Sequence, residues 1–415
     1  MLSRGQDQDP LPILIRGARQ LITLRGPRGP RRGSEMSQLG IITDGAILIR
    51  AGKILEVGPT RRVENLAIAR RAQEIEAAGK VVMPGFIDSH THLLNGAWRE
   101  GDAARSVRTS TAQRLQYRAQ AHVQTMSRHG ATTIEVKTGS GVDPRAEIKL
   151  LRVMGNLNGD AMNIVPTFLL RFSPVSPEPL SELALTEKLE HLLGNIKRRR
   201  LARFADVAWE SDGDHCKFFE RHLSVCRQHG FGLKVHAGPR KTADAIAAAI
   251  RALAVSVDHL EHATEEEARV LAGSPTMAVL APASTLRGNR PAPARTLIDA
   301  GVPLALATDF DPHHNPILSM QTLVALACLY LGMNHAEAIT ACTINGAHAL
   351  GCAQTVGSLE PGKSADIVFL KTGDCRDLAG HVGENLVQMT IKGGKVIYQE
   401  GEVAPRDLPD RPAWW

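Results

Sequence analysis

The middle of the chain alternates short apolar runs with amphipathic stretches. The apolar runs predict eight strands, at residues 81–87, 131–136, 164–170, 204–208, 232–235, 255–257, 277–280 and 302–307. Helical patterns, such as 243–254 and 293–300, lie between most of them. Strands that alternate with helices predict a parallel sheet. Eight such units are typical of a closed (β/α)8, TIM-like barrel. A doubly wound open sheet is the alternative, but no Gly-x-Gly-x-x-Gly segment follows the first strand.

The two ends of the chain have a different pattern. Short strands are predicted at 12–15, 21–24, 46–49 and 54–57, and again at 366–370, 387–391 and 395–398, with glycine-containing turns between neighbours. Such spacing predicts hairpins. Because both ends share the pattern, we expect them to form one small β-sandwich. The expected division is 1–83 and 354–415 for the two parts of the sandwich, and 84–353 for the barrel.

Two more helices are predicted after the last barrel strand. Residues 317–331 are strongly apolar, and the following helix starts at Asn334 with Glu337 three positions on. Asparagine is a favoured N-cap, and a glutamate at that spacing completes a capping box.

Composition indicates an ordinary globular protein, with 43% hydrophobic, 22% charged and only 4% aromatic residues. The net charge of +6 is concentrated in a Gly/Pro-rich loop at 25–32 and in a run at 197–200. No aromatic residues interleave with these charges, so we expect neither nucleic-acid nor membrane binding. None of the six cysteines forms a Cys-x-x-Cys pair, residues 1–10 are polar, and no run of 18 apolar residues occurs. These features favour a cytoplasmic protein with reduced thiols.

The first predicted barrel strand ends in His-x-His. It reads Pro-Gly-Phe-Ile-Asp-Ser-His-Thr-His from Pro84 to His92. Residues i and i+2 of a strand point to the same face, so His90 and His92 should face one point at the carboxyl end of the strand. Barrel enzymes build their active sites at that end. Alone, the motif also fits two unrelated surface histidines.

Three further barrel strands end in side chains that can bind a metal. His236 ends the fifth strand, His259 the sixth and Asp309 the eighth. Chance placement of all five groups at the same end of a barrel is improbable, so the pattern predicts a metal-dependent active site.

These segments resemble the amidohydrolase superfamily. The resemblance rests on the Pro-Gly-Phe-Ile-Asp-Ser-His-Thr-His, Val-His-Ala, Asp-His-Leu-Glu and Ala-Thr-Asp segments. Segments 132–139, 293–302 and 357–366 extend it, and they are similar to the imidazolonepropionases, hydrolases that open a ring in histidine degradation. The resemblance covers nearly the whole chain.

The resemblance implies one divalent metal ion, zinc first with iron, manganese or cobalt as alternatives. Its implied ligands are His90, His92, His236 and Asp309. Asp309 would also take a proton from the attacking water and pass one to the leaving nitrogen, and His259 would hydrogen-bond the attacked group or the water. Arg99 matches the position at which imidazolonepropionases hold an arginine for the substrate, and its guanidinium suits a carboxylate.

Several positions depart from the family pattern. Pro239 stands where a glutamate is expected three residues past His236, Ser140 replaces the tyrosine of a Gly-Tyr-Gly tract, and Phe172 replaces a histidine. Residues 311–316 replace an Asn-Pro-Gly tract. The candidate substrate-binding set is therefore Arg99, Ser140, Arg171, Phe172, Arg287, His313 and His314.

These observations predict a metal-dependent hydrolase of non-peptide C–N bonds. We expect it to open a cyclic amide or imidazolone-type ring, or to cleave a related carboxylate-bearing amide. Strict imidazolonepropionase activity is one version of this hypothesis. A deaminase of the same superfamily and a non-catalytic metal-binding paralogue are the alternatives. The expected partners are a small anionic substrate and a second copy of the chain, as a homodimer.

Overall fold

Eight parallel strands follow one another in a single sheet in chain order. The structure, a computed structural model, describes residues 11–95, 107–139, 143–159, 161–171, 182–208, 216–237, 242–288 and 290–401. The strands are β8 (Phe86–Asp88), β9 (Ala131–Lys137), β10 (Asn163–Leu170), β11 (Phe204–Ala208), β12 (Gly232–His236), β13 (Ser256–Asp258), β14 (Met277–Leu280) and β15 (Leu304–Leu306). This order confirms the predicted barrel and excludes the doubly wound sheet, whose strand order reverses.

The sheet closes between the segments that follow its first and last strands. Thr91 and Phe310 form a parallel bridge. The backbone N–H of His92 donates to the carbonyl of Phe310 (2.7 Å), and that of Asp309 donates to the carbonyl of His90 (3.0 Å). Closure therefore brings the end of β8 directly beside the end of β15.

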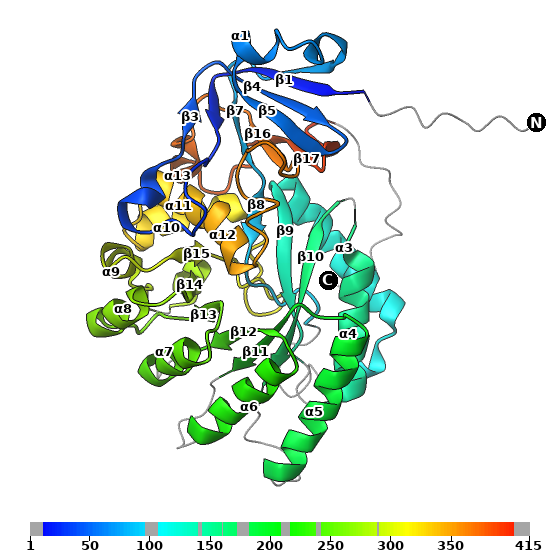
Figure 1. Cartoon of the computed structure of the whole chain (residues 1–415), viewed down its shortest axis with the longest axis vertical. Coiled ribbons are helices and arrows are strands. Elements are labelled where there is room, and N and C mark those ends of the chain that lie inside the picture. The colour runs from blue at the N-terminus through cyan, green and yellow to red at the C-terminus, as the bar shows by residue number, and fades with distance from the viewer. Residues whose placement is uncertain are drawn as a thin grey trace, which may run out of the picture.

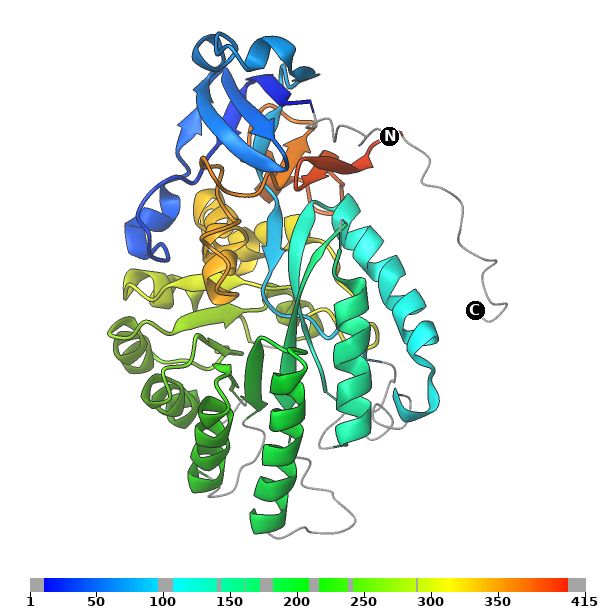
Figure 2. The same cartoon turned by 45° about the vertical axis from the view of Figure 1, so that its right-hand side comes forward.

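Helices cover the outside of the barrel (Figures 1 and 2). They are α3 (Ala112–Arg128), α4 (Pro144–Leu157), α5 (Glu182–Arg198), α6 (Cys216–Gln228), α7 (Thr242–Arg251), α8 (Glu265–Ala272) and α9 (Ala294–Asp299). In α4, for example, Asp143 caps the first turn, while Leu150, Leu151 and Met154 are buried. Each helix thus turns an apolar stripe to the sheet.

The last barrel strand is followed directly by α10 (Met320–Tyr330), α11 (His335–Ala341) and α12 (Ile344–Ala349). The predicted capping box is confirmed, because Asn334 accepts from the backbone of Glu337 and the Glu337 side chain accepts from the backbone of Asn334. No helix in the described residues is long and apolar enough to cross a membrane.

Two further sheets lie outside the barrel, and the two chain ends pair with each other in one of them, as predicted. One has the order β5 (Lys53–Pro59), β4 (Gly45–Arg50), β1 (Ile13–Ala18), β6 (Gln73–Glu76). The other has the order β18 (Lys395–Gln399), β17 (Val387–Lys392), β16 (Ile367–Leu370), β7 (Val81–Pro84), β2 (Gln20–Ile22), β3 (Ile41–Ile42). The short helix α1 (Thr60–Val63) packs against β4 and β5, whereas α13 (Asp377–Gly380) packs against α10. Figure 1 shows the blue and the orange to red strands gathered at one end of the barrel. Ile15, Val82 and Phe369 share one core cluster between the sheets.

The run at 81–87 was predicted as one barrel strand, and that prediction is wrong. Residues 81–84 form β7, which pairs with β2 and β16, while residues 86–88 form β8 in the barrel. The break falls at Gly85, where a Cβ atom would come within 2.4 Å of the buried Thr132 side chain. Glycine therefore lets the chain pass closely over β9 as it changes sheets.

Candidate metal centre

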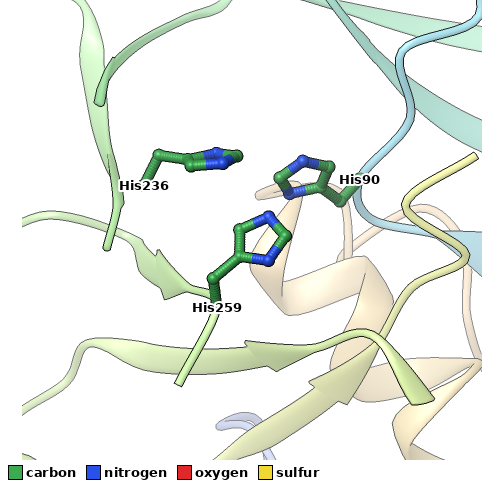
Figure 3. A group of neighbouring side chains, drawn as sticks. All are labelled: His90, His236 and His259. Carbon is green, nitrogen blue, oxygen red and sulfur yellow. The ribbon is translucent and has the colours of Figure 1, made fainter. Parts of the chain in front are cut away.

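Five of the predicted site residues come together at the carboxyl end of the barrel. His90 and His92 follow β8, His236 is the last residue of β12, His259 follows β13 and Asp309 lies three residues past β15. In Figure 3 the rings of His90, His236 and His259 point toward one another from separate strands. The ring centroids of His236 and His259 are 4.2 Å apart, and those of His90 and His236 are 5.2 Å apart.

Three ligand atoms converge most closely. The Nε2 atoms of His90 and His92 lie 3.1 Å apart, and Oδ1 of Asp309 lies 3.6 Å from each of them. His90, His236 and His259 form a second group whose ring nitrogens lie within 4.8 Å of one another. Nitrogen atoms with a carboxylate oxygen are the donor set that zinc and similar transition metals accept.

The hydrogen bonding of His90 suits a metal ligand. Its Nδ1 lies 2.7 Å from Oδ2 of Asp258. A carboxylate accepts from the ring, so Nδ1 carries the proton and Nε2 keeps its lone pair. Burial, and next the charge of Lys137, hold the pKa of His90 well below its usual range. A neutral imidazole with a free Nε2 is the form that binds a metal.

His92 and His236 are also held neutral. Burial is the main cause that lowers the pKa of each well below the usual value, with Arg171 next for His92 and His259 next for His236. Nδ1 of His236 is buried and has no hydrogen-bond partner among the residues that the structure describes. A buried ring nitrogen without a hydrogen-bond partner is energetically unfavourable. Coordination of a metal ion by this neutral ring would be consistent with that arrangement. The residues present therefore fit a divalent metal.

His259 differs from the other three histidines. Burial alone would lower its pKa, but the Glu261 carboxylate, 3.7 Å from Nδ1, and then Asp309 outweigh burial and raise the pKa to about 9. The raised pKa favours the protonated form of this ring. It is suited to donate a hydrogen bond to an oxygen that gains negative charge. The sequence pattern did not single out Glu261.

The backbone is strained at two of these positions. His259 has φ 62° and Asp309 has φ 51°, both in the left-handed region that side-chain-bearing residues rarely adopt. Strain of this kind costs about 1–3 kcal/mol per residue and clusters at functional sites. The surrounding barrel therefore holds both side chains in orientations that a relaxed backbone would not favour.

A buried ionic network lies beneath the histidines, inside the barrel. Nζ of Lys137 contacts carboxylate oxygens of Asp206 at 2.5 Å and Asp258 at 2.8 Å. Nζ of Lys234 contacts Glu135 at 2.9 Å. These five side chains are buried almost completely. The sequence analysis did not identify these five residues, although the alternation of side chains along each strand could have indicated them. Glu135 and Lys137 share one face of β9, and Lys234 shares a face with His236.

The remaining candidates lie in different places. Arg171 follows β10 and lies near the centre, because its charge adds to burial in lowering the pKa of His92 and partly opposes the burial that raises the pKa of Asp309. Arg287 ends a 3-10 helix (η3, Pro282–Arg287) and is exposed. The backbone N–H groups of His313 and His314 donate to Asp311. Arg99, Ser140 and Phe172, together with Pro239, lie outside the described residues.

Comparison with known proteins identifies the family. Residues 81–397 match the amidohydrolase family. An imidazolonepropionase of Parabacteroides distasonis is 38% identical over 92% of this chain and 98% of that protein. An imidazolonepropionase of Symbiobacterium thermophilum is 36% identical over 96% of this chain and all of that protein.

Two solved structures share the fold at low sequence identity. An adenosine deaminase from Xanthomonas campestris with bound zinc has a TM-score of 0.68 at 19% identity, covering 95% of this chain and 94% of that one. Guanine deaminase of E. coli has a TM-score of 0.70 at 18% identity, covering 94% and 99%. The family match, the two relatives that align with nearly the whole chain and the barrel fold all indicate the same family. This chain belongs to the amidohydrolase family, as a metal-dependent hydrolase of non-peptide C–N bonds similar to imidazolonepropionases.

Proposed function

We propose that this hydrolase opens a small carboxylate-bearing cyclic amide, of the lactam, hydantoin or imidazolone type. In this proposal one divalent ion is held by His90, His92, His236 and Asp309. One observation carries the proposal: the Nε2 atoms of His90 and His92 and Oδ1 of Asp309 converge on one point at the barrel mouth. Zinc is the first choice, with iron, manganese or cobalt as alternatives, because the same donors accept all four.

The bound ion would supply Lewis-acid activation of water. The chain's own residues would move the protons and stabilise charge. Burial raises the pKa of Asp309, which suits a carboxylate that takes a proton and later passes it to the leaving nitrogen. His259 would donate a hydrogen bond to the oxygen of the attacked carbonyl. Glu261 would keep the His259 ring in orientation for this role.

Substitution of the proposed ligands tests the centre. His90→Ala and His236→Ala should each remove most bound metal and abolish turnover, because each change removes one of four ligands. Metal content by elemental analysis and activity are measured together, with exposed His381 replaced by alanine as the control. Wild-type metal content and turnover in both ligand variants would refute the assignment.

A cavity lined by residues that follow His92 in the chain supports an anionic substrate. Its volume is about 210 Å³, and its wall includes Leu93, which directly follows His92, together with Arg118, His122 and His313. The guanidinium of Arg118, on α3, has no hydrogen bond or ion pair with any side chain in the described ranges. Leucine side chains and a free guanidinium fit a short alkyl arm that ends in a carboxylate.

Arg118→Met tests this preference without affecting the metal ligands. We expect KM for a carboxylate-bearing ring to rise about ten- to a hundredfold, the range for a lost charge-assisted hydrogen bond. KM for the methyl ester of the same compound should stay unchanged. Arg114→Met removes a positive charge one turn earlier on the same helix and serves as the control. Equal effects of the two variants would argue against a specific carboxylate contact.

The ring itself should differ from that of imidazolone propionate. The relatives named imidazolonepropionase support the class of ring chemistry. Pro239 and Phe172 stand where that family carries polar residues, so this chain has fewer groups to hydrogen-bond an imidazolone. Steady-state kcat/KM across imidazolone propionate and carboxylate-bearing lactams, hydantoins and amides decides the point. A value above about 10⁵ M⁻¹s⁻¹ for imidazolone propionate, as the best substrate, would contradict this part of the proposal.

We propose further that the protein works in the cytoplasm as a homodimer. The five described cysteines, Cys226, Cys328, Cys342, Cys352 and Cys375, form no disulfides, which agrees with a reducing compartment. Closed two-fold dimers are the commonest assembly of such proteins. Light scattering coupled to size-exclusion chromatography measures the mass against 44.8 kDa per chain.

A further inference from the structure

Lys137 is a buried charged side chain close to the centre. It lies at the end of β9 and is about 1% exposed. Its Nζ lies 2.5 Å from Oδ2 of Asp206 and 2.8 Å from Oδ2 of Asp258. Glu135 adds a third carboxylate at 3.6 Å. Burial alone would lower the pKa of Lys137, but these three carboxylates outweigh burial and raise it, so the side chain is a permanent cation.

The carboxylate of Asp258 joins Lys137 to the metal centre. Its Oδ2 contacts both Nζ of Lys137 and Nδ1 of His90, at 2.8 and 2.7 Å. Its Oδ1 accepts from the hydroxyl of Ser256 at 2.9 Å. Both oxygens of Asp258 are therefore fixed, and Lys137 with Ser256 determines how the carboxylate meets the His90 ring.

Lys137 also offsets the repulsion between two buried carboxylates. Asp206, His236 and Asp258 offer ligand atoms within 4.8 Å of one another. Two carboxylates at this depth repel each other unless a cation lies between them. The ammonium group of Lys137 occupies that position. The same Oδ2 atom of Asp258 that Lys137 contacts at 2.8 Å lies 2.7 Å from Nδ1 of His90, so the ammonium group lies beside the oxygen that accepts from the ring.

We propose that Lys137 is a positioning residue of the metal centre, which acts through Asp258 to orient His90. In this arrangement Lys137 fixes the Asp258 carboxylate, the carboxylate fixes the proton of His90 on Nδ1, and Nε2 would be left free to bind an ion. Partners of metal-binding histidines typically change metal affinity by about 10- to 100-fold when they are removed. The inference rests on the proposed role of His90 as a ligand.

Lys137→Met tests the inference, because it keeps the length of the side chain and removes the charge. Lys234→Met is the matched control, since Lys234 is equally buried but pairs with Glu135 and makes no contact with Asp258 or His90. Metal-free proteins are titrated with Co²⁺. Affinity and the visible spectrum, which reports ligand geometry, are measured on folded fractions matched by circular dichroism.

Lys137→Met should weaken Co²⁺ binding by about 10- to 100-fold and shift the spectrum, whereas Lys234→Met should leave both near wild type. Asp258→Asn should reproduce the Lys137→Met effect, and the double variant should add little to either. Wild-type affinity and spectrum in Lys137→Met would overturn the inference, as would equal losses in the two lysine variants. His90→Ala separates the two proposals: unchanged Co²⁺ binding in that variant would contradict the ligand assignment itself.

Discussion

At the residue scale, the four histidines of the centre have two chemical characters. His90, His92 and His236 have pKa values held well below the usual range, mainly by burial. His259 lies within the same cluster but beside Glu261, and its pKa is raised to about 9. Neighbouring groups, and not residue type, therefore separate the proposed ligands from the proposed hydrogen-bond donor.

This difference leads to a prediction for His259→Ala. The variant should keep its metal, while kcat falls by roughly 10²–10⁴-fold, as is typical when a positioned donor or acid–base group is lost. Metal content and steady-state rates are measured on the same preparation. Because His259 lies within 4.8 Å of the ring nitrogens of His90 and His236, the opposite outcome is informative. Loss of metal, with activity recovered on reconstitution, would make His259 a ligand.

At the scale of elements, one glycine separates the barrel from the sandwich. Gly85 joins β7 to β8, and a Cβ atom at this position would meet Thr132 of β9 at 2.4 Å. Thr132 is fully buried in a β9 that is buried along its whole length. Neither strand can move away easily, since β7 is paired on both sides.

Gly85→Ala should therefore destabilise the protein by about 1–3 kcal/mol, the usual cost of overpacking a core. Gly155→Ala is the control, because Gly155 lies exposed in α4 with open space around it. Alanine there should be neutral or stabilising by up to about 1 kcal/mol. Chemical denaturation compares the two variants. Equal stability of the two variants would show that position 85 has room for a Cβ atom, contrary to its geometry.

At the scale of the whole molecule, the proposed ligands come from three barrel segments that are distant in the chain. His90 and His92 follow β8, His236 ends β12 and Asp309 follows β15. An ion that binds them stabilises the closed barrel relative to the unfolded chain. We propose that the barrel spans 84–353 and that 1–83 and 354–415 form the sandwich. The change of sheet at Gly85 supports the first boundary.

Metal removal should therefore lower the melting temperature. At a free metal concentration about 100 times Kd, binding contributes about 2.7 kcal/mol to the free energy of unfolding. Calorimetry with and without a chelator measures the shift. His90→Ala should melt near the chelated wild type and should not respond to the chelator. A wild-type melting temperature that is insensitive to chelation would contradict a metal bound at this barrel mouth.

Local pattern was enough to predict the fold class and the five residues that meet at the barrel mouth. Alternation along a strand determines which side chains share a face, and parallel strands all end at one edge of a barrel. His90, His92, His236, His259 and Asp309 could therefore be placed together without coordinates. The pairing of the two chain ends also followed from a pattern that both ends share.

Contacts between distant strands were decided only by the tertiary structure. The run at 81–87 is apolar throughout, so its division between two sheets depends on which strands pair with it. Asp258 and His90 lie 168 positions apart, yet their side chains meet at 2.7 Å. Lys137 reaches Asp258 only because the register of the barrel brings the two to one level. Strand register, and with it each buried charge pair, is set by closure of the whole barrel, which no local segment encodes.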